Sequence, residues 1–599
     1  MKQSLCWAAD FETTTDINDC RVWAYSLCNV EDPSEFIYGN SIDGFIDWCK
    51  EKENRTLYFH NLRWDAEFLL SYLGVHGYSF VEDKKERADC TYTTVISDTG
   101  EIYSLEIYFS VTKKHTNKVT IYDSMKIFPN FSVAKIAKSF DLPISKLKID
   151  YHKYRPVGYE LDQQEIDYIR NDVEIVARAL KQMFDNGLTK MTLASDALTY
   201  YKSTVKNFRT LFPLLDEESD AIARASYKGG FTYVSDKYKE KELGEGMTLD
   251  VNSLYPSILR YESLPYGWPV AFEGKYTPDK SYPLYVQTLT CKFVLKEGKI
   301  PSIQIKGSPF FVANEYLTDS NDDIVTLTLT SVDLKLFFDQ YDVEVLTWGG
   351  GLKFKAAKGM FNEYVDFWMN QKITADKDKN AGQKQIAKLM LNSLYGKFGL
   401  SSIADKKIPI VTEQGRVEYK MVCGEKRDTV YCPVATFVTS YGRDKTIRTS
   451  QAIRVWGLDN KGYDPYVYSD TDSIKCLLKE PDLDKLKDVV QVDKYLLGYW
   501  ALEELYQKIL AIRQKCYITL SEGRVHPTIA GLPKYLAPII NFDNFKRGFT
   551  TSGLSIKDLQ ELARLNGASE EEIEEVHHKT TYKHCNGGLV LVDTDFTIK

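Results

Sequence analysis

The chain has 599 residues, 43% of them hydrophobic and 27% charged, and its formal net charge is −8. One compact core needs far fewer residues, so several domains are expected. The acidic balance excludes a basic footprint over the whole surface, so any surface for nucleic acid must be local.

Cysteine and histidine spacings argue against zinc sites and for a reducing compartment. The eleven cysteines contain no Cys-x-x-Cys pair, and the eight histidines have no spacing that suits zinc. We therefore expect small buried thiols in a cytoplasmic protein. Asp10 interrupts the N-terminal apolar run before a signal-peptide core can form, and no later run is long enough to cross a membrane.

The first acidic elements follow apolar runs. A strand is predicted over residues 5–11, and it leads into Asp10 and Glu12. Residues two apart in an extended chain project to the same side, so these two carboxylates share a face. A second apolar run, 57–59, precedes a predicted helix that carries Asp65.

A later helix, predicted over residues 162–184, adds Asp172 and Tyr168, which are four apart and therefore share a face. Each element alone is ordinary, since acidic strand ends are usually solvated and a helical tyrosine is usually core. Together, four carboxylates from three elements can hold two metal ions beside a tyrosine hydroxyl. Two such ions activate water and stabilise the leaving oxygen of a phosphodiester, which is nuclease chemistry.

Two segments have patterns that suit phosphate. Residues 146–153 combine lysines with aromatic rings, which can contact a nucleic-acid backbone or form a solvated charged face. The segment 227–232 contains Gly229 and Gly230 between aromatic residues. Paired glycines allow a backbone to approach a phosphate closely, and a simple turn is an equally good interpretation.

A second acidic group is predicted further along the chain. The strand over residues 247–251 carries Asp250, and residues 467–478 form two strands joined by a tight turn that holds Asp470 and Asp472. If the chain is locally extended there, the last two carboxylates lie side by side, and a divalent metal would relieve their repulsion. A solvated acidic turn is the alternative.

Residues 263–361 are rich in Pro, Gly, Tyr and β-branched residues, and we interpret them as an inserted β-rich region. Two helices follow, the first over residues 360–373. The second carries four polar or aromatic side chains at spacings of four, four and three, so they share one face: Lys384, Lys388, Asn392 and Tyr395. With Lys372 on the first helix, this face suits a triphosphate and a base, although exposed lysines are often only solvated.

The C-terminal part is predicted to contain a strand over residues 514–518 with Lys515 and Tyr517 on one face. Helices are predicted over residues 555–565 and 569–578, the second with a capping box, and a last strand over 587–592.

The motifs in this order resemble known families. The acidic elements of residues 1–190 resemble the DEDDy class of 3′–5′ exonucleases. Three later motifs resemble family B DNA polymerases: Asp-x-x-Ser-Leu-Tyr-Pro from Asp250, Lys-x-x-x-Asn-Ser-x-Tyr-Gly from Lys388, and Tyr-x-Asp-Thr-Asp-Ser from Tyr468. The forms Tyr-Lys-Gly-Gly-Phe at 227–231 and Lys-Cys-Tyr at 515–517 are similar to the protein-primed subgroup of phage replicative polymerases.

The resemblance implies a multidomain α/β and α+β fold. A ribonuclease-H-like exonuclease domain, residues 1–190, would precede a right-hand polymerase domain, residues 191–599. Within the latter it implies a palm at about 191–262 and 428–530, a first insertion at about 263–361, fingers at about 362–397, a second insertion at about 400–427, and a thumb and C-terminal region at about 531–599.

The same resemblance implies residue roles, with two Mg²⁺ ions at each site and Mn²⁺ as an alternative ion. At the polymerase site it implies metal ligands Asp250, Val251 and Asp472, catalytic support from Asp470, and nucleotide or primer-end contacts from Val251, Tyr255, Lys372, Lys384, Lys388, Asn392, Tyr395, Lys515 and Tyr517. Tyr255 would exclude a 2′-hydroxyl.

At the exonuclease site the resemblance implies metal ligands Asp10, Glu12, Asp65 and Asp172, assisted catalytically by Tyr168 and Lys146. Contacts to DNA would come from Thr13, His60, Asn61, Phe68 and Ser124, and, between the two sites, from Tyr227, Gly229 and Gly230.

The implied partners are primer–template DNA, single-stranded DNA, deoxynucleoside triphosphates and a priming terminal protein that contacts the first insertion. The second insertion would support strand displacement, and a monomer in the host cytoplasm is expected. Departures are Cys516, where threonine is usual, and a glutamate-rich helical insert at about 553–579, which we expect to face solvent or a protein partner.

Two other classes of protein fit part of the pattern. A reverse transcriptase also pairs carboxylates at a hairpin, but those are usually adjacent, whereas Thr471 separates them here. A binding protein with degenerate sites would lack some of the expected carboxylates, and none is missing.

Overall fold

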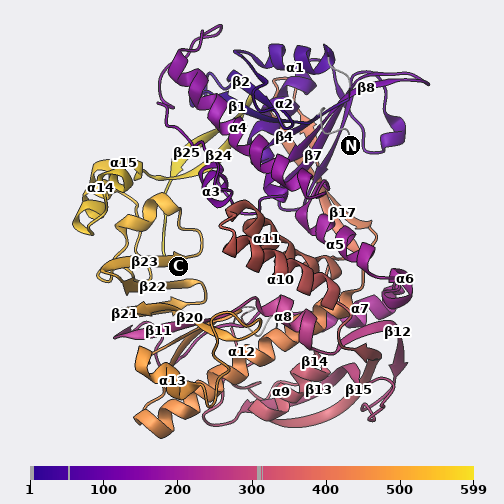
Figure 1. Ribbon diagram of the computed structural model, residues 1–599, viewed down its shortest axis with the longest axis vertical. Coiled ribbons are helices and arrows are strands. Elements are labelled where there is room, and N and C mark those ends of the chain that lie inside the picture. The colour runs from indigo at the N-terminus through magenta and orange to yellow at the C-terminus, as the bar shows by residue number, and fades with distance from the viewer. Residues whose placement is uncertain (1–5, 52–53, 306–311, 313–314) are drawn as a thin grey trace.

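The computed structural model describes residues 6–51, 54–305, 312 and 315–599. Figure 1 shows an N-terminal α/β unit above a larger unit, with two helices between them and the C-terminal segment along one side. Within the described residues, no helix combines the length and apolarity that crossing a bilayer requires.

The N-terminal unit is built on an eight-stranded sheet in the order β3-β2-β1-β4-β8-β7-β6-β5, with β1 parallel to β4 and β4 parallel to β8. Its elements are β1 (Cys6–Thr13), β2 (Val22–Asn29), β3 (Phe36–Gly39), α1 (Ile42–Glu51), β4 (Arg55–Phe59), α2 (Leu62–Val75), β5 (Ser79–Phe80), β6 (Thr91–Ile96), β7 (Ile102–Val111), β8 (Thr116–Asp123), α3 (Val133–Ser139) and α4 (Gln163–Asp185).

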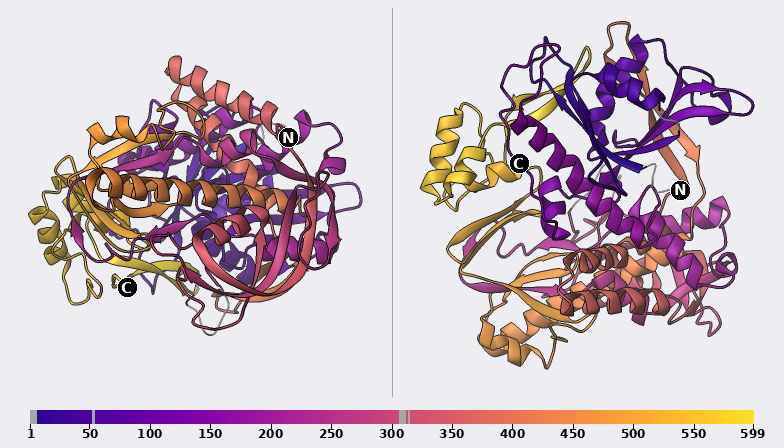
Figure 2. Two further views of the ribbon diagram at one scale, coloured as in Figure 1. Left: turned by 90° about the horizontal axis from the view of Figure 1, so that it is seen from below. Right: turned by 45° about the horizontal axis from the view of Figure 1, so that its top comes forward.

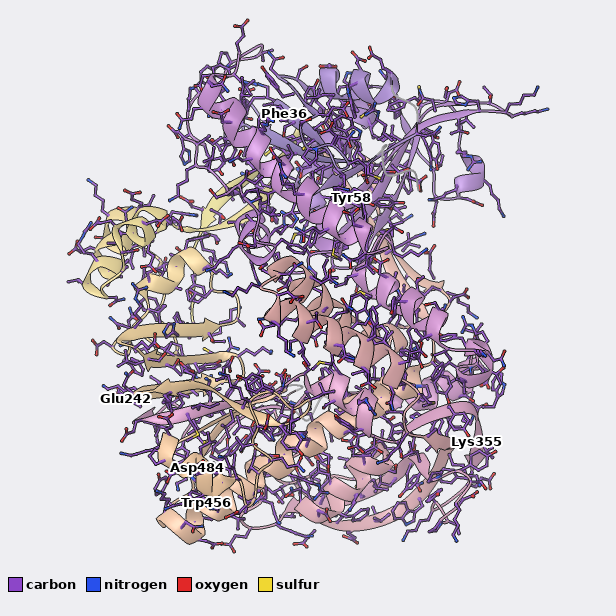
Figure 3. All side chains as sticks on the ribbon, in the orientation of Figure 1. Phe36, Tyr58, Glu242, Lys355, Trp456 and Asp484 are labelled. Atoms are coloured by element: carbon purple, nitrogen blue, oxygen red, sulfur yellow. The ribbon has the colours of Figure 1, made fainter. Side chains whose placement is uncertain are left out.

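Helices cover both faces of this sheet, which explains why β1 is apolar on both sides. Cys6 and Ala8 belong to a core shared with α4, whereas Trp7 and Ala9 belong to a core shared with α1 and α2. Tyr58 of β4 lies on the α4 side (Figure 3), with its ring centroid 5.7 Å from that of Phe184. Burial on both faces fixes β1, and with it the acidic strand end.

A five-stranded sheet, ordered β20-β11-β19-β18-β9, forms the centre of the larger unit. Its elements and the helices around them are α5 (Leu193–Thr204), α6 (Phe208–Leu211), α7 (Glu217–Ala225), β9 (Thr232–Val234), β11 (Gly246–Val251), α8 (Leu254–Tyr261), α12 (Cys432–Lys461), β18 (Tyr466–Asp470), β19 (Ser473–Cys476), α13 (Leu483–Leu486) and β20 (Trp500–Tyr506). Figure 2, left, shows α12 running across the underside.

Residues of β11 alternate between the two faces of its sheet, so its apolar side chains and Asp250 lie on opposite faces. Met247, Leu249 and Val251 share a core with α8 and α12. Because successive strand residues point to opposite faces, Asp250 projects from the other face of the sheet.

The remaining elements form insertions, a helix pair and the C-terminal region. The first insertion contains β12 (Leu264–Phe272), β13 (Leu284–Leu295), β14 (Val325–Thr330), α9 (Ser331–Gln340) and β15 (Tyr341–Ala357), in the sheet order β12-β15-β13-β14. The helix pair is α10 (Asn362–Lys377) and α11 (Ala381–Phe398), and a hairpin of β16 (Ile403–Val411) and β17 (Val417–Lys426) follows.

The C-terminal region has its own core and returns to the N-terminal unit. It contains β21 (Lys508–Arg513), β22 (Cys516–Ser521) and β23 (Arg524–Ile529), which form a sheet with β10 (Glu242–Leu243), then α14 (Ile556–Leu565), α15 (Glu570–Glu575), β24 (Lys579–Cys585) and β25 (Gly588–Thr594). In Figure 1 the β24–β25 hairpin reaches the upper unit, where Gly588 packs on Phe68 of α2.

Two sequence predictions of local structure need correction. The strand predicted over residues 514–518 begins only at Cys516, because Lys515 has φ +53° and belongs to the β21–β22 turn, so Lys515 and Tyr517 do not share a strand face. The helix predicted over residues 569–578 ends at Glu575, since Val576 is extended. The capping box at its start is confirmed.

Candidate functional site

Three carboxylates converge in the N-terminal unit. Asp10 and Glu12 at the end of β1 and Asp172 on α4 offer oxygen atoms that all lie within 4.8 Å of one another. The spacing of two along β1 and the capping box at Asp162, which starts α4, bring them together. The convergence predicted from the sequence is therefore confirmed for these three.

The charges in this group are only partly balanced by the residues around it. Burial and the neighbouring Asp172 raise the pKa of Asp10 to about 7, and burial together with Asp10 and Asp172 raises the pKa of Glu12. Asp172 Oδ1 is buried and has no hydrogen-bond partner among the described residues. An unpartnered oxygen within a group of repelling carboxylates fits a divalent cation.

Asp65 lies beside this group, but it is not one of the residues whose ligand oxygens all lie within 4.8 Å of one another. Its Oδ1 accepts a hydrogen bond from the Phe11 backbone N–H at 3.2 Å. Burial, followed by the charge of Asp10, raises its pKa well above the ordinary value. The fourth expected carboxylate is thus a neighbour of the other three.

A lysine and two tyrosines border the acidic group. Lys146 Nζ donates to Asp172 Oδ2 at 2.7 Å and lies 5.4 Å from the Tyr168 ring centroid. The hydroxyl oxygens of Tyr168 and Tyr151 are 2.8 Å apart. Tyr151 was not predicted as a site residue, although its place in the basic and aromatic run 146–153 was a usable signal.

Polar residues expected to contact DNA lie at neighbouring strand ends. Ser124 O–H donates to His60 Nδ1 at 2.9 Å, and His60 Nε2–H donates to the Phe131 carbonyl at 2.8 Å, with burial lowering the pKa of His60. The Asn61 backbone N–H donates to Asp123 Oδ1 at 3.1 Å, and Thr13 ends β1 half-buried. Parallel strands β1, β4 and β8 bring these ends to the edge that holds Asp10 and Glu12.

Phe68, expected to contact single-stranded DNA, requires a correction. Its side chain is 1% exposed, and a Cβ added to Gly588 would lie 2.4 Å from its ring. The C-terminal hairpin covers the ring, so its surface is not available to a DNA strand in this arrangement. The sequence offered no signal for a contact between residues so far apart.

The second acidic group forms around the β18–β19 turn. Asp250 of β11 pairs in register with Ser473, the residue that follows Asp472 in the chain. Burial, Asp472 and Glu503 raise the pKa of Asp250 to about 7, and burial raises that of Asp472. These two repelling carboxylates also fit a divalent cation. The Val251 backbone N–H donates to the Asp472 carbonyl at 2.8 Å, which fixes one segment against the other.

Asp470 has a different environment from Asp472. Thr471 between them has φ +59°, a left-handed conformation, so the two aspartates are not successive same-side residues of an extended strand as predicted. Lys515 Nζ lies 3.2 Å from Asp470 Oδ2, and Thr232 O–H donates to Asp470 Oδ1 at 3.0 Å. Asp470 therefore anchors Lys515 at the turn.

Glu503 was missed by sequence reasoning. It lies on β20, where the pairing with β11 shifts between Thr248 and Leu249, so it is the extra residue of a β-bulge. Its charge acts on both Asp250 and Asp472. A bulge changes the face to which a residue points, and no spacing in the sequence announces it.

The helix pair brings three lysines together. Burial and the charges of Lys388 and Lys384 lower the pKa of Lys372. Lys388 also acts electrostatically on Asp250, so it faces the acidic turn, whereas Lys384 Nζ donates to Asp376 Oδ1 of α10 at 2.5 Å. Mutual repulsion of three ammonium groups is relieved by a polyanion such as a triphosphate. Asn392, on the same face of α11, is exposed.

Aromatic rings lie near the acidic turn, since the charge of Asp472 acts on both Tyr255 and Tyr395. The Tyr255 and Tyr395 ring centroids are 4.2 Å apart, which pairs the start of α8 with the end of α11. Tyr517 lies 4.9 Å from Tyr468, and Lys475 Nζ lies 5.0 Å from the Tyr517 ring centroid.

The paired glycines lie against the acidic turn. A Cβ added to Gly230 would lie 2.6 Å from Thr471 Oγ1, so close packing requires glycine there, whereas Gly229 has open space. The hydroxyl of Tyr227 packs against Gly399 at the end of α11. This segment therefore touches both the acidic turn and the helix pair.

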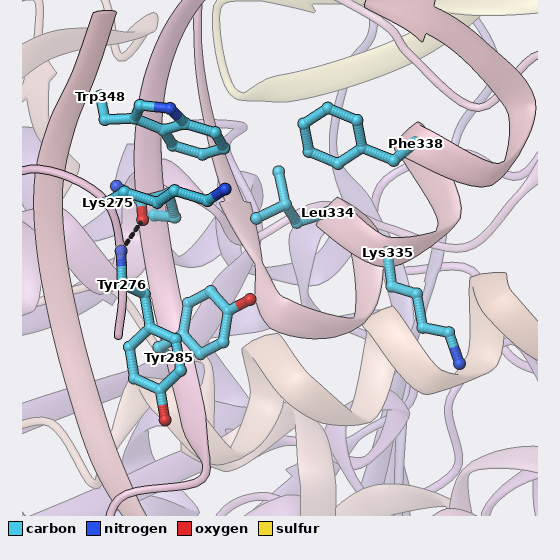
Figure 4. A pocket seen from close by; sticks show the side chains of 8 residues that line it. Lys275, Tyr276, Tyr285, Leu334, Lys335, Phe338 and Trp348 are labelled. Carbon is cyan, nitrogen blue, oxygen red and sulfur yellow. Dashed lines mark hydrogen bonds between the residues drawn. The ribbon is translucent and has the colours of Figure 1, made fainter. Parts of the chain in front are cut away.

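A separate hollow of about 360 Å³ lies in the first insertion (Figure 4). Its lining carries no carboxylate and consists of Lys275, Tyr276, Tyr285, Gln287, Leu334, Lys335, Phe338 and Trp348. Lys275 Nζ lies 5.1 Å from the Trp348 ring centroid. None of these residues was predicted as a site residue, because they come from β13, α9, β15 and the loop between β12 and β13.

Comparisons with known proteins agree along the whole chain. Residues 46–485 match the family model of DNA polymerase type B, organellar and viral. The chain is 41% identical to the DNA polymerase of Bacillus phage phi29 over 99% of both chains, and 32% identical to that of Streptococcus phage Cp-1 over 99% of this chain and 98% of the relative.

Solved structures show the same similarity. The phi29 DNA polymerase complexed with primer-template DNA and incoming nucleotide substrates superposes with a TM-score of 0.87 at 40% identity, covering 99% of this chain and 100% of that one. The phi29 enzyme complexed with single-stranded DNA gives a TM-score of 0.86 at 39% identity with the same coverage.

Proposed function

The chain belongs to the phi29-like, protein-primed family B DNA polymerases, and we propose that its two acidic groups catalyse two different reactions on DNA. It is a DNA polymerase with exonuclease and polymerase domains and insertions. We assign template-directed synthesis to the group at Asp250 and Asp472, and 3′–5′ proofreading to the group at Asp10, Glu12 and Asp172.

At the polymerase site we assign two Mg²⁺ ions, or Mn²⁺, to Asp250, Asp472 and the Val251 carbonyl. When bound, such ions lower the pKa of the primer 3′-hydroxyl and neutralise charge on the leaving pyrophosphate. Asp470 holds Lys515 at 3.2 Å, which keeps an ammonium group beside the turn where the primer end would lie.

The incoming nucleotide is bound by residues of the helix pair. Lys372, Lys384 and Lys388 supply positive charge for the triphosphate, and their mutual repulsion supports this assignment. Tyr255 and Tyr395 form an aromatic floor at 4.2 Å separation. A ring at this position leaves no room for a 2′-hydroxyl, so Tyr255 selects deoxyribonucleotides.

At the exonuclease site we assign two ions of the same kind to Asp10, Glu12, Asp65 and Asp172. Lys146 orients Asp172 through their 2.7 Å hydrogen bond and offsets part of the acidic charge. Tyr168 and its partner Tyr151 supply hydroxyl groups beside the carboxylates. Thr13, His60, Asn61 and Ser124 form the polar strand ends along which a single-stranded primer end would lie.

Membership of this family supports a proposal for the domain division and the partners. We propose an exonuclease domain over residues 1–190 and a polymerase domain over 191–599, acting as a monomer in the cytoplasm of the host on primer–template and single-stranded DNA. A terminal protein would prime synthesis from the first insertion, and the second insertion, about 400–427, would support strand displacement on a linear genome.

The observation that carries the proposal is the pair of separate acidic groups, one on β1 and α4 and the other on β11 and the β18–β19 turn. An end-labelled primer on a longer DNA template, with Mg²⁺, tests it. We expect the primer to lengthen when deoxynucleotides are present and to shorten when they are absent. Asp472→Ala should abolish only the lengthening, and Asp10→Ala should abolish only the shortening. Loss of both activities in either variant would contradict two independent sites.

A further inference from the structure

One buried arginine joins three distant parts of the polymerase domain. Arg443 of α12 is only 4% exposed, and each of its five N–H donors has an acceptor within the protein. Nε donates to Asp333 Oδ1 at 3.1 Å, and Nη2 donates to Asp333 Oδ2 at 2.6 Å and to Ser440 Oγ at 3.0 Å. Such a bidentate pair is the strong form of an arginine–carboxylate contact.

The other arm of Arg443 holds the paired-glycine segment. Nη1 donates to the carbonyl oxygens of Lys228 and Gly229, both at 2.8 Å. A planar guanidinium presents its donors in a fixed fork, so orienting one edge toward Asp333 aims the other edge at these carbonyls. The position of the glycine segment therefore depends on the arginine–aspartate pair.

Asp333 is itself fixed from three sides. It lies in the first turn of α9, where Thr330 O–H and Ser440 O–H donate to Oδ2 at 3.0 Å and 2.7 Å. Burial acts to raise its pKa, but the Arg443 guanidinium and the charge of Lys228 hold that pKa below its ordinary value. Arg443 and Asp333 thus form a buried ion pair whose remaining oxygen contacts are made by hydroxyl groups.

The glycine segment continues directly into the acidic turn. Gly230 packs on Thr471, whose backbone N–H donates to the Phe231 carbonyl at 2.7 Å. Thr446 of α12, three residues after Arg443, donates through its hydroxyl to the Thr471 carbonyl at 2.7 Å. One helix therefore holds both the glycine segment and the turn between Asp470 and Asp472.

We propose that Arg443 and Asp333 are positioning residues that keep the primer end at the polymerase site by fixing the glycine segment against the β18–β19 turn. The inference rests on the proposed function, since it assumes that a primer end moves between the two acidic groups. The pair contacts the backbone beside the polymerase turn. Loosening the segment therefore shifts the primer end toward the exonuclease site.

Arg443→Lys tests this with the charge retained. An ammonium group can still pair with Asp333, but it lacks the fork that reaches two carbonyls at once. The double variant Asp333→Asn/Arg443→Gln removes both charges together, so that no buried charge is left alone if the first variant folds poorly. The matched control is Arg448→Lys, because Arg448 also joins α12 to α9, through Asp339 at 2.8 Å, and its second carboxylate partner is Asp444 of its own helix.

The readout is a primer whose 3′-terminal base is 2-aminopurine, bound with its template in EDTA so that neither reaction proceeds. Its fluorescence rises when the terminal base leaves the duplex stack. We expect the ratio of unstacked to stacked ends to rise about tenfold in Arg443→Lys and in the double variant, the effect of losing one or two charge-assisted hydrogen bonds. Arg448→Lys should match the wild type.

Activity assays with Mg²⁺ separate positioning from folding. Degradation of a single-stranded oligonucleotide should stay at the wild-type rate, while extension should need higher nucleotide concentrations to overcome degradation. Equal fluorescence in all variants, or losses of both activities in parallel with the unfolding temperature, would overturn the inference. A wild-type protein that neither extends nor degrades DNA would instead contradict the proposed function, and the fluorescence in EDTA does not depend on it.

Discussion

The Lys146 ammonium donates to Asp172 Oδ2 at 2.7 Å, while Oδ1 of the same carboxylate is buried and has no hydrogen-bond partner among the described residues. One oxygen of Asp172 is therefore held in place and the other is left for a cation. Lys146 therefore orients one carboxylate of the proposed exonuclease site.

Replacing Lys146 with methionine should lower the single-strand degradation rate about 100-fold, the usual effect of removing one charged group from a preorganised site. The long apolar side chain keeps most of the packing against Tyr168. Primer extension with saturating deoxynucleotides should be unchanged, and rates on gels measure both. Equal loss of the two activities would show a general structural role.

Tyr255→Val should admit ribonucleotides. Removing the ring opens the space beside Tyr395, so the ratio of kcat/KM for a deoxynucleotide to that for its ribonucleotide should fall about 100-fold. Single-nucleotide incorporation at varied concentrations measures the ratio. Tyr395→Phe, which keeps its ring, should retain the wild-type discrimination, and an unchanged ratio in Tyr255→Val would remove Tyr255 from this role.

The contact between the C-terminal hairpin β24–β25 and the N-terminal unit should become less stable as the pH rises. His584 Nδ1 lies 3.2 Å from Glu67 Oε2, and this hydrogen bond raises the pKa of His584, while Arg416 and Arg63 act to lower it. Tyr419 O–H donates to the other oxygen of Glu67 at 2.6 Å. A histidine pKa raised by folding adds stability below the unfolded-state pKa, and that stability is lost as the pH rises through the folded-state pKa.

Thermal unfolding of the wild type and His584→Gln at a series of pH values checks this. The difference between them should be largest near about pH 5.5 and should vanish above about pH 8. Because His584 is partly exposed, solvent screening should keep the effect below about 1 kcal/mol. A difference that does not change with pH would mean that His584 acts through packing alone.

The hollow in the first insertion provides a test of priming. Trp348→Ala combined with Phe338→Ala removes two of the rings that line it. Buried aromatic anchors commonly dominate an interface, so formation of the first nucleotide–protein bond should fall at least tenfold with the terminal protein as primer. Extension of a DNA primer should stay unchanged. Equal loss of both reactions would show that the substitutions disturb folding instead of priming.

Much of the acidic architecture could be predicted because it follows local periodicity. Side chains alternate between the two faces of a strand, so Asp10 and Glu12, two residues apart, lie on one side of β1. The capping residue Asp162 marks the start of α4. The helix pair and the capping box at Ser569 were likewise local. Lys384 and Lys388 share one face of α11 because they are four residues apart, and the charges of both act on Lys372 of α10.

The rest depends on tertiary structure that local patterns do not contain. Glu503 reaches the acidic turn only because of a β-bulge, and Phe68 is covered by a hairpin more than 500 residues further along the chain. Arg443 is one of many arginines on helices, and its role appears only when α9, α12 and the glycine segment meet. The left-handed Thr471 could not be foreseen, since β-branched residues rarely adopt that conformation.

Each acidic group should hold divalent cations. Crystals grown with Mn²⁺ and measured at the manganese absorption edge test it directly. We expect anomalous peaks among Asp10, Glu12 and Asp172 and between Asp250 and Asp472. The first should be lost in Asp10→Ala and the second in Asp472→Ala. Crystals of an active protein that bind Mn²⁺ elsewhere and show no peak at either group would contradict it.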